Sequence, residues 1–373
     1  MIVPSKKQLP EMEVEIEYDD LPDRSGGFGG TTLWVVNHGS PESVASLRYM
    51  ALLPARARRE PVARFVTGMS EAAFLDRWRP RTLVVTKAFE PAVVALALAA
   101  RQRSIRVIAV LCDDRSAWSH YQDLDRRLAG LADEVVVQTD AMARHVLGTF
   151  GRESTIIEEP YEVPEAPPRF DPGSLIKLLW YGRSGNHDTL CPGILPLVDD
   201  ATVRFDLTVV TDRLSRDLMT LARRMSDSDT GNLTIREWSL SCQAEALSRT
   251  DLVLIPSFDR QDKHVKGHNR LTESIRAGVP ALVYALPAYR ELAEFCWCGE
   301  DLRVGLRWAL AHRPSLLDRV RRGQSYVAER FSVDRIAACW QRLFDGDPSG
   351  TGPAASAGPE ADGCPASPTF RTP

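Results

Sequence analysis

The segment that most constrains the fold runs from Leu252 to Leu286, because it has the pattern of a strand, a polar loop, a short helix and a second strand. Apolar runs at Leu252–Pro256 and Ala281–Leu286 bracket it. Between them, Leu271 and Ile275 are four residues apart and therefore share one face of a helix. Parallel strands need such a crossover connection, so this segment predicts an α/β fold with a parallel sheet.

The polar loop before that helix lies at the carboxyl end of a parallel strand, where open α/β sheets bind ligands. Asn269 is expected to cap the helix, and Gly278 followed by Pro280 ends it. Free amides at the helix start, with Lys266 beside them, suit a phosphate group. Glu273, one turn further along, is placed to accept hydrogen bonds from hydroxyl groups. This combination describes a site for a nucleotide-sugar.

Glu273 also has a structural interpretation. It could pair with Arg270 or Arg276 on a solvated helix face, an interaction worth about 0.2–0.5 kcal/mol. We favour the binding interpretation, because basic, small, amide and acidic residues fall together in one strand-to-helix loop.

The motif Asn-Arg-Leu-x-Glu-Ser-x-x-Ala-Gly-Val-Pro at residues 269–280 resembles the nucleotide-sugar segment of GT-B glycosyltransferases, most of all the family 4 group. The resemblance implies that Glu273 holds the ribose of a nucleotide-sugar donor, a substrate, with no cofactor. Family members carry another Glu earlier in the chain, where Val265 and Lys266 stand here. The spelling Gly-His-Asn-x-Leu-x-Glu also resembles Kdo transferases, which use a CMP-sugar. The resemblance extends over residues 170–345.

Length and composition set further bounds. A chain of 373 residues fits two domains of about 150 residues each. The net charge of −4 argues against a general nucleic-acid binder, which is usually basic. Seven cysteines, an odd number spread along the chain, do not make a disulfide framework. Neither a signal-peptide pattern at the start nor a long apolar run is present, so we expect a cytoplasmic protein.

The apolar runs form two α/β halves, which predicts two Rossmann-like doubly wound domains facing each other across a cleft. A proline-rich stretch between the halves predicts a linker. The expected divisions are a flexible leader (1–30), an N-terminal acceptor-binding domain (31–160), the linker (161–173), a C-terminal nucleotide-sugar-binding domain (174–330), a closing helix that returns to the N-terminal domain (331–345) and a disordered tail (346–373).

The two ends of the chain have unusual compositions. In the leader, glutamates alternate with apolar residues from Glu11 to Tyr18, which is typical of either an added edge strand or an acidic disordered arm. The glycine run at 26–30 precedes the first strand and is interpreted as a flexible join. The tail is rich in Pro, Gly, Ala and Ser, and it lacks the large apolar side chains that would offset the entropy of ordering it.

A second candidate loop follows the first strand of the C-terminal half, at 175–181. Its glycine turn lets the backbone approach a diphosphate closely. The turn consists of Gly182, Arg183, Ser184 and Gly185. The family resemblance implies that Arg183 stabilises the leaving diphosphate. Trp238, after the strand at 233–238, either stacks on the nucleobase or is a buried core residue.

In the N-terminal half, Asp113 and Asp114 end a core strand. They are candidates for a general base on an acceptor hydroxyl, although aspartates at strand ends also cap loops. No other Asp pair follows a strand in the manner of a metal-binding motif, and we expect no metal site. Lys87 and His38 end neighbouring strands and are candidates for binding acceptor or phosphate.

A basic cluster lies between Arg48 and Arg64, mixed with Leu52, Leu53 and Phe65. Such a mixture suits peripheral contact with an anionic membrane or an anionic acceptor. A solvated arginine-rich face is the alternative.

Together these features predict a glycosyltransferase that moves a sugar from a nucleotide-sugar to a glycan, lipid or small-molecule acceptor, in polysaccharide or glycoconjugate biosynthesis. Arg183, Lys266 and Lys263 would stabilise the leaving diphosphate without a metal, with help from the amides of Gly267, His268 and Asn269. Two alternatives remain: a non-hydrolysing nucleotide-sugar 2-epimerase, and a catalytically degenerate binding module.

Overall fold

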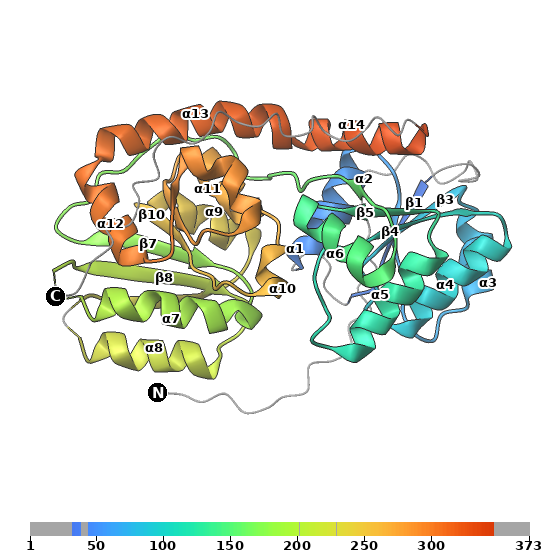
Figure 1. The fold of residues 1–373 in the computed structure, drawn as a ribbon, viewed down its shortest axis with the longest axis horizontal. Coiled ribbons are helices and arrows are strands. Elements are labelled where there is room, and N and C mark those ends of the chain that lie inside the picture. Colours follow the sequence, from blue (N-terminus) through green and yellow to red (C-terminus); the bar gives the residue numbers. More distant parts are fainter. Residues whose placement is uncertain (1–31, 39–43, 201, 229, 347–373) are drawn as a thin grey trace.

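The computed structural model describes residues 32–38, 44–200, 202–228 and 230–346. These residues form two lobes, each built on a six-stranded parallel sheet with helices on both faces (Figure 1). The predicted α/β class with two Rossmann-like units is therefore confirmed. The leader at 1–30 and the tail beyond Gly346 lie outside the described residues.

The N-terminal lobe has the strand order β2-β1-β3-β4-β5-β6. Its strands are β1 (Thr32–Val36), β2 (Val62–Arg64), β3 (Thr82–Thr86), β4 (Arg106–Val110), β5 (Glu134–Val137) and β6 (Thr155–Ile156). Its helices are α1 (Ala45–Leu47), α2 (Leu53–Ala57), α3 (Glu71–Trp78), α4 (Pro91–Gln102), α5 (Ser119–Leu131) and α6 (Asp140–Phe150), with a π-helical segment at Arg48–Leu52.

The C-terminal lobe has the order β12-β11-β10-β7-β8-β9. Its strands are β7 (Ile176–Tyr181), β8 (Phe205–Thr211), β9 (Leu233–Glu237), β10 (Leu252–Ile255), β11 (Ala281–Val283) and β12 (Trp297–Cys298). Its helices are α7 (His187–Val198), α8 (Arg216–Ser226), α9 (Leu240–Arg249), α10 (Gln261–His264), α11 (Asn269–Arg276), α12 (Leu302–Ala311) and α13 (Arg313–Phe331), with 3₁₀ turns at Ser184–Asn186 and Pro287–Phe295.

The strand orders fix where ligands can bind. In each sheet the chain starts near the middle and builds outward in both directions, so the loops after two neighbouring strands diverge and leave a crevice. The order reverses between β7 and β10 in one lobe and between β1 and β3 in the other. The predicted loops after β7 and β10 therefore flank one crevice, and the loops after β1 and β3 flank the opposing one.

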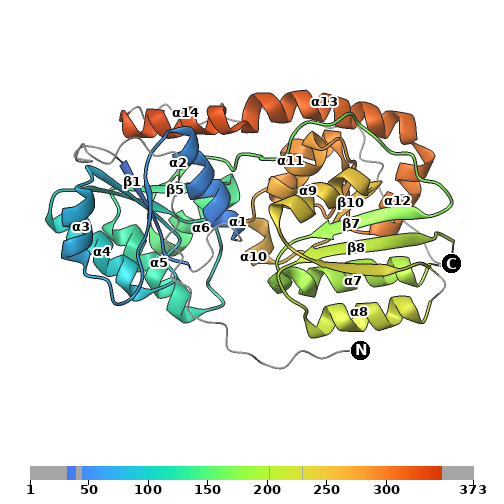
Figure 2. The same cartoon turned by 180° about the vertical axis from the view of Figure 1, so that it is seen from behind.

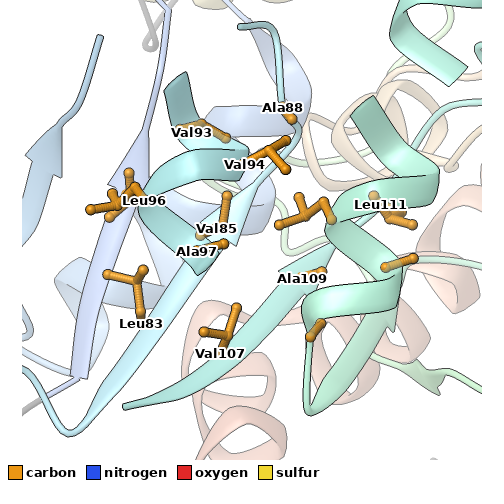
Figure 3. Packing of buried hydrophobic residues seen from close by; sticks show 14 of the residues in the cluster. Leu83, Val85, Ala88, Val93, Val94, Leu96, Ala97, Val107, Ala109 and Leu111 are labelled. Atoms are coloured by element: carbon orange, nitrogen blue, oxygen red, sulfur yellow. The ribbon is translucent and has the colours of Figure 1, made fainter. Parts of the chain in front are cut away.

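Both faces of each sheet are buried, because successive side chains of a strand point to opposite faces. In the N-terminal lobe, Leu83, Val85, Val107 and Ala109 pack against α4 and its neighbours (Figure 3). The alternate residues of the same strands pack in a second core with α2 and the last helix. This arrangement explains the nearly continuous apolar runs in the sequence.

The last helix, α14 (Val333–Phe344), leaves the C-terminal lobe and packs on the N-terminal one (Figures 1 and 2). Ser332 separates it from α13, and its hydroxyl accepts a hydrogen bond from the amide of Arg335 at 3.4 Å. Trp340 is fully buried and lies edge-on to Trp34 of β1, with ring centroids 4.7 Å apart. Helix α14 thus ties the two lobes together.

The proline-rich segment at 161–173, predicted as a linker, lies along the C-terminal lobe. Its backbone amides at Ala166 and Arg169 donate to the carbonyls of Arg276 and Gly278 at 3.1 and 2.9 Å. Gly278 has φ +69°, and a Cβ there would lie 2.3 Å from the carbonyl oxygen of Pro167, so only glycine fits beside the segment. These hydrogen bonds attach the segment to the C-terminal lobe.

Candidate functional site

A cleft of about 850 Å³ lies between the lobes. It is lined by the loops at the carboxyl ends of both sheets, as the strand orders require. All of the predicted site residues except His268 line it. They are Asp113, Asp114, Gly182, Arg183, Ser184, Gly185, Trp238, Lys266, Gly267, Asn269 and Glu273.

The two predicted loops of the C-terminal lobe meet at this cleft. Lys263 donates to the side-chain oxygen of Asn186 at 3.3 Å, and this contact joins the loop after β10 to the loop after β7. A second pair of contacts links Arg270 and Tyr181: the tyrosine hydroxyl donates to the carbonyl of Arg270 at 2.8 Å, and the Arg270 guanidinium reaches the carbonyl of Tyr181 at 3.5 Å. The convergence that the motif predicts is therefore present in the structure.

Arg183 faces the cleft, and 41% of its side chain is exposed. Its guanidinium lies 3.4 Å from a carboxylate oxygen of Asp212, at the end of β8. The other oxygen of Asp212 accepts a hydrogen bond from the amide of Ser184 at 2.6 Å. Asp212 therefore holds the glycine turn in place and partly balances the Arg183 charge.

Lys266 lies across the cleft from the N-terminal lobe and pairs with Asp113 there. The other oxygen of Asp113 pairs with Lys87, at the end of β3. Burial alone would raise the pKa of Asp113, but the two ammonium groups outweigh it and hold that pKa well below its ordinary value. An aspartate held ionised by two lysines is a weak base, so the geometry does not support the general-base role expected for Asp113.

Asp114 also differs from the expectation. It is 5% exposed, and its Oδ1 accepts a hydrogen bond from the amide of Ser116 at 2.9 Å. The same oxygen lies 3.6 Å from Nε2 of His145. These contacts match the loop-capping alternative for Asp114, because the carboxylate holds the turn after β4.

Glu273 is 2% exposed and lies in a hydrogen-bonded chain that crosses the cleft. The hydroxyl of Tyr49, from the N-terminal lobe, donates to Oε1, and the amide of Gln243 donates to Oε2 at 2.6 Å. Gln243 in turn accepts from the indole N–H of Trp238 at 2.8 Å. Burial raises the pKa of Glu273 to about 7. The alternative of a solvated helix pair is wrong, because Glu273 is buried and both arginines have other partners. Arg276 pairs with Glu165 at 2.6 Å, and the Arg270 guanidinium reaches the carbonyl of Tyr181.

Two details of the α11 start differ from the sequence prediction. The N-cap is His268, without a side-chain cap, and the Asn269 oxygen accepts instead from the neighbouring amide of Arg270 at 2.7 Å. His268 is buried away from the cleft, 3% exposed, with its ring 4.5 Å from that of Phe331. The His268 side chain therefore packs against Phe331, away from the cleft, and only its backbone belongs to the loop before α11.

One group among the described residues brings together three potential metal ligands: Glu158, His268 and Glu291, with ligand atoms within 4.8 Å of one another. The Arg330 guanidinium already lies between the two carboxylates, 3.1 Å from Glu158 and 2.6 Å from Glu291. Arg330 thus offsets part of the negative charge of this group.

Sequence patterns missed Glu159, a third buried acid of the cleft. It is 5% exposed, lies beside Gly267, and burial raises its pKa to about 7. A Cβ on Gly267 would lie 1.9 Å from Oε2 of Glu159, so a side chain at position 267 would force the buried Glu159 carboxylate to move. Glu159 follows the short strand β6, and no motif marks it in the sequence.

The residues between Arg48 and Arg64 that were predicted to form one basic and apolar surface do not all lie on the surface. Arg48 is 4% exposed and pairs with Glu162. Leu52, Leu53 and Phe65 are buried in the core, so they cannot form the apolar face of a membrane contact. No helix among the described residues has both the length and the apolar character to cross a membrane.

Comparisons with known proteins place this architecture. No protein-family model and no curated protein matches the sequence. Similar solved structures include the following three. HepE from Anabaena in complex with UDP-glucose has a TM-score of 0.64 at 12% identity, over 85% of this chain and 99% of that one. A glycosyltransferase from Rickettsia africae has a TM-score of 0.58 at 11% identity, over 86% of this chain and 98% of that one. A putative UDP-N-acetylglucosamine 2-epimerase from Listeria monocytogenes has a TM-score of 0.51 at 13% identity, over 85% of this chain and 96% of that one.

These similarities extend over both lobes, and at such identities they establish the fold. They agree with the two parallel sheets of this structure. The chain has the GT-B fold of glycosyltransferases.

Proposed function

We propose that this protein transfers a sugar from a nucleotide-sugar to an acceptor hydroxyl. The observation that carries the proposal is the convergence of the loops after β7 and β10 on one interlobe cleft, with Arg183, Lys263 and Lys266 among its lining residues. In a doubly wound sheet this is where a ligand binds, and these cations suit an anionic one.

Each part of a donor has a matching group in the C-terminal lobe. Trp238 offers an aromatic surface to the base, Glu273 offers a carboxylate to the ribose, and the cations with the start of α11 suit the diphosphate. The similar HepE structure holds UDP-glucose. We therefore infer a UDP-sugar as the first donor to test, with CMP-sugars second because of the Kdo-transferase resemblance.

The chemical problem in glycosyl transfer is charge. As the glycosidic bond to the donor breaks, negative charge grows on the leaving diphosphate and positive charge grows on the sugar ring. Arg183 and Lys266 would stabilise the diphosphate as protein cations, without a metal, and removing either would cost about a hundredfold in rate. Both now face aspartates, Asp212 and Asp113, which a diphosphate has to displace.

The test is a product analysis with purified full-length protein and a panel of UDP-, GDP-, ADP-, dTDP- and CMP-sugars. We expect slow hydrolysis of one donor, faster turnover with an acceptor, loss of about a hundredfold in rate in Arg183→Ala, and insensitivity to EDTA. Arg303→Ala, which changes an exposed arginine outside the cleft, is the matched control. Turnover that requires added metal would contradict the proposal that protein cations alone stabilise the leaving diphosphate.

The same assay separates the alternatives. An epimerase, suggested by the Listeria structure, would convert the donor to its 2-epimer without any acceptor. A binding module would bind a nucleotide without turnover. For a transferase we further propose a role in polysaccharide or glycoconjugate biosynthesis in the cytoplasm, with a glycan or lipid-linked acceptor at the N-terminal lobe.

A further inference from the structure

An exposed indole faces the cleft from the N-terminal lobe. Trp118, directly before α5, is 59% exposed and lines the cleft. Among the described residues it is the only large exposed apolar side chain that does so; the others lie elsewhere on the surface. Exposed apolar surface within a cleft marks a ligand contact more often than apolar surface scattered elsewhere.

The backbone that presents Trp118 is firmly held. Arg115 is 6% exposed; it pairs with Asp125 and donates to the carbonyl of Ala88 at 2.8 Å. The amide of Trp118 donates to the carbonyl of Arg115 at 2.9 Å, closing a tight turn. The indole therefore stands on a pre-organised loop, as a binding residue requires.

Two further aromatic rings line the cleft on the same lobe. Phe89 and Tyr121 are half-buried, with centroids 6.4 Å apart in an edge-to-face arrangement. The Arg115 guanidinium lies over both rings, at 5.8 and 5.0 Å. The amide of Phe89 is fixed by the side chain of Asn37 at 2.7 Å, in the crevice between β1 and β3. The aromatic wall, defined as Trp118, Phe89 and Tyr121, thus borders the predicted acceptor crevice.

The surroundings of this wall select the class of ligand. Charged side chains border the wall: the Lys87 ammonium lies 5.3 Å from the centroid of the Phe89 ring, Glu90 follows Phe89 in the chain, and both line the cleft. An alkyl chain placed there would exclude water from these charged groups and offer them no polar partner. A sugar ring matches better, because one face carries only C–H groups while its edge carries hydroxyls. The C–H face can cover an indole as the hydroxyls reach the polar side chains.

We infer that the aromatic wall is an acceptor subsite for a sugar ring, stacked on Trp118, so that the acceptor is a saccharide or the sugar part of a glycoconjugate. The acceptor role in this inference rests on the proposed function. Binding of a sugar to the aromatic wall does not, and it can be measured without a donor.

Saturation-transfer NMR on the full-length protein tests the contact, with methyl glycosides of glucose, galactose, mannose and N-acetylglucosamine as probes and dodecyl phosphate as the alkyl probe. We expect saturation on the C–H face of at least one glycoside, reduced at least fivefold in Trp118→Ala and kept in Trp118→Phe. Leu214→Ala, an exposed apolar residue outside the cleft, is the matched control. An unchanged melting temperature in Trp118→Ala, within about 2 °C, excludes misfolding.

No glycoside signal in the wild type, equal signals in Trp118→Ala, or Trp118-dependent binding of the alkyl probe alone would each overturn the inference. Calorimetry with UDP and CMP on the same variants separates the two proposals. If no nucleotide binds but the glycoside signal depends on Trp118, the proposed function fails and the sugar contact stands. With an active donor, we expect Trp118→Ala to raise the acceptor KM at least tenfold while leaving nucleotide affinity within twofold.

Discussion

The hydroxyl of Tyr49 donates a hydrogen bond to Glu273 across the cleft, from the N-terminal lobe to helix α11, which follows the loop after β10. Gln243 occupies the other carboxylate oxygen at 2.6 Å. Both oxygens that a ribose would need are therefore bound to protein groups in this structure. Under the proposed function, a nucleotide whose ribose binds Glu273 would replace Tyr49, and this exchange would link donor binding to the contact between the lobes.

Replacing Tyr49 with Phe should tighten nucleotide binding. The change removes the hydroxyl that competes with the ribose, and a net hydrogen bond of about 0.5–1.5 kcal/mol corresponds to roughly 2–10-fold in Kd. Calorimetry at pH 8 measures it. Tyr326→Phe is the control, because that hydroxyl bonds to Glu291 outside the cleft. Weaker binding in Tyr49→Phe would show that Tyr49 itself holds the nucleotide.

The buried acids predict a specific pH dependence of stability. Burial raises the pKa of Glu159 to about 7, whereas an unfolded glutamate has a pKa of about 4.3. The folded state therefore keeps a proton that the unfolded state releases. Its stabilising effect is complete below about pH 4, declines between about 4 and 7, and is lost above 7.

Glu159→Gln removes this titration while keeping the shape of the neutral acid. Urea denaturation at pH 5 and pH 8 should show a smaller loss of the free energy of unfolding in the variant than in the wild type, by on the order of 1–3 kcal/mol. Parallel curves for the two proteins would show that Glu159 does not titrate in this range.

A side chain at position 267 should destabilise the fold, because the buried Glu159 carboxylate would have to move. Its Cβ would lie 1.9 Å from Oε2 of Glu159, and overpacking of this kind costs about 1–3 kcal/mol. We expect Gly267→Ala to lower the free energy of unfolding by that amount, and Glu159→Ala in the same chain to recover part of it. Gly185→Ala, in the facing loop, has open space around its Cβ and should change stability little. Equal effects at the two glycines would refute the steric account.

Trp340 should hold the closing helix on the N-terminal lobe. It is fully buried against Trp34, and truncation of such a side chain costs about 3–5 kcal/mol. Urea denaturation of Trp340→Ala should show this loss, while Arg335→Ala, exposed on the same helix, should lie near the wild type. A loss below about 1 kcal/mol would mean that α14 contributes little to joining the lobes.

The sequence was a good guide to features encoded over short spans. The runs at 252–256, 281–286 and 175–181 match β10, β11 and β7, because strands buried on both faces are almost wholly apolar. Residues of the motif at 269–280 and of the glycine turn at 182–185 line the cleft. Elements with weaker patterns, such as β2 and α3, were not predicted; β2 is three residues long, and only Phe74 and Leu75 are buried in α3.

Features that depend on distant residues were beyond such patterns. Tyr49 and Glu273 are 224 positions apart, and their contact follows from how two lobes close. The pairing of Asp113 with Lys266 also crosses the cleft, so a strand-end aspartate that suggested a base proved to be an ion-pair partner. Glu159 became visible only through its burial beside Gly267.

The central claim is that the loops after β7 and β10 together bind the diphosphate of a nucleotide-sugar. Calorimetry with UDP, UMP and uridine, repeated for the cytidine, guanosine, adenosine and thymidine series, tests it most directly on the wild type, Arg183→Ala and Lys266→Ala. We predict that one diphosphate binds more tightly than its nucleoside, and that each variant loses most of this advantage. If no nucleotide binds, or if a diphosphate and its nucleoside bind equally well to all three proteins, the account is contradicted.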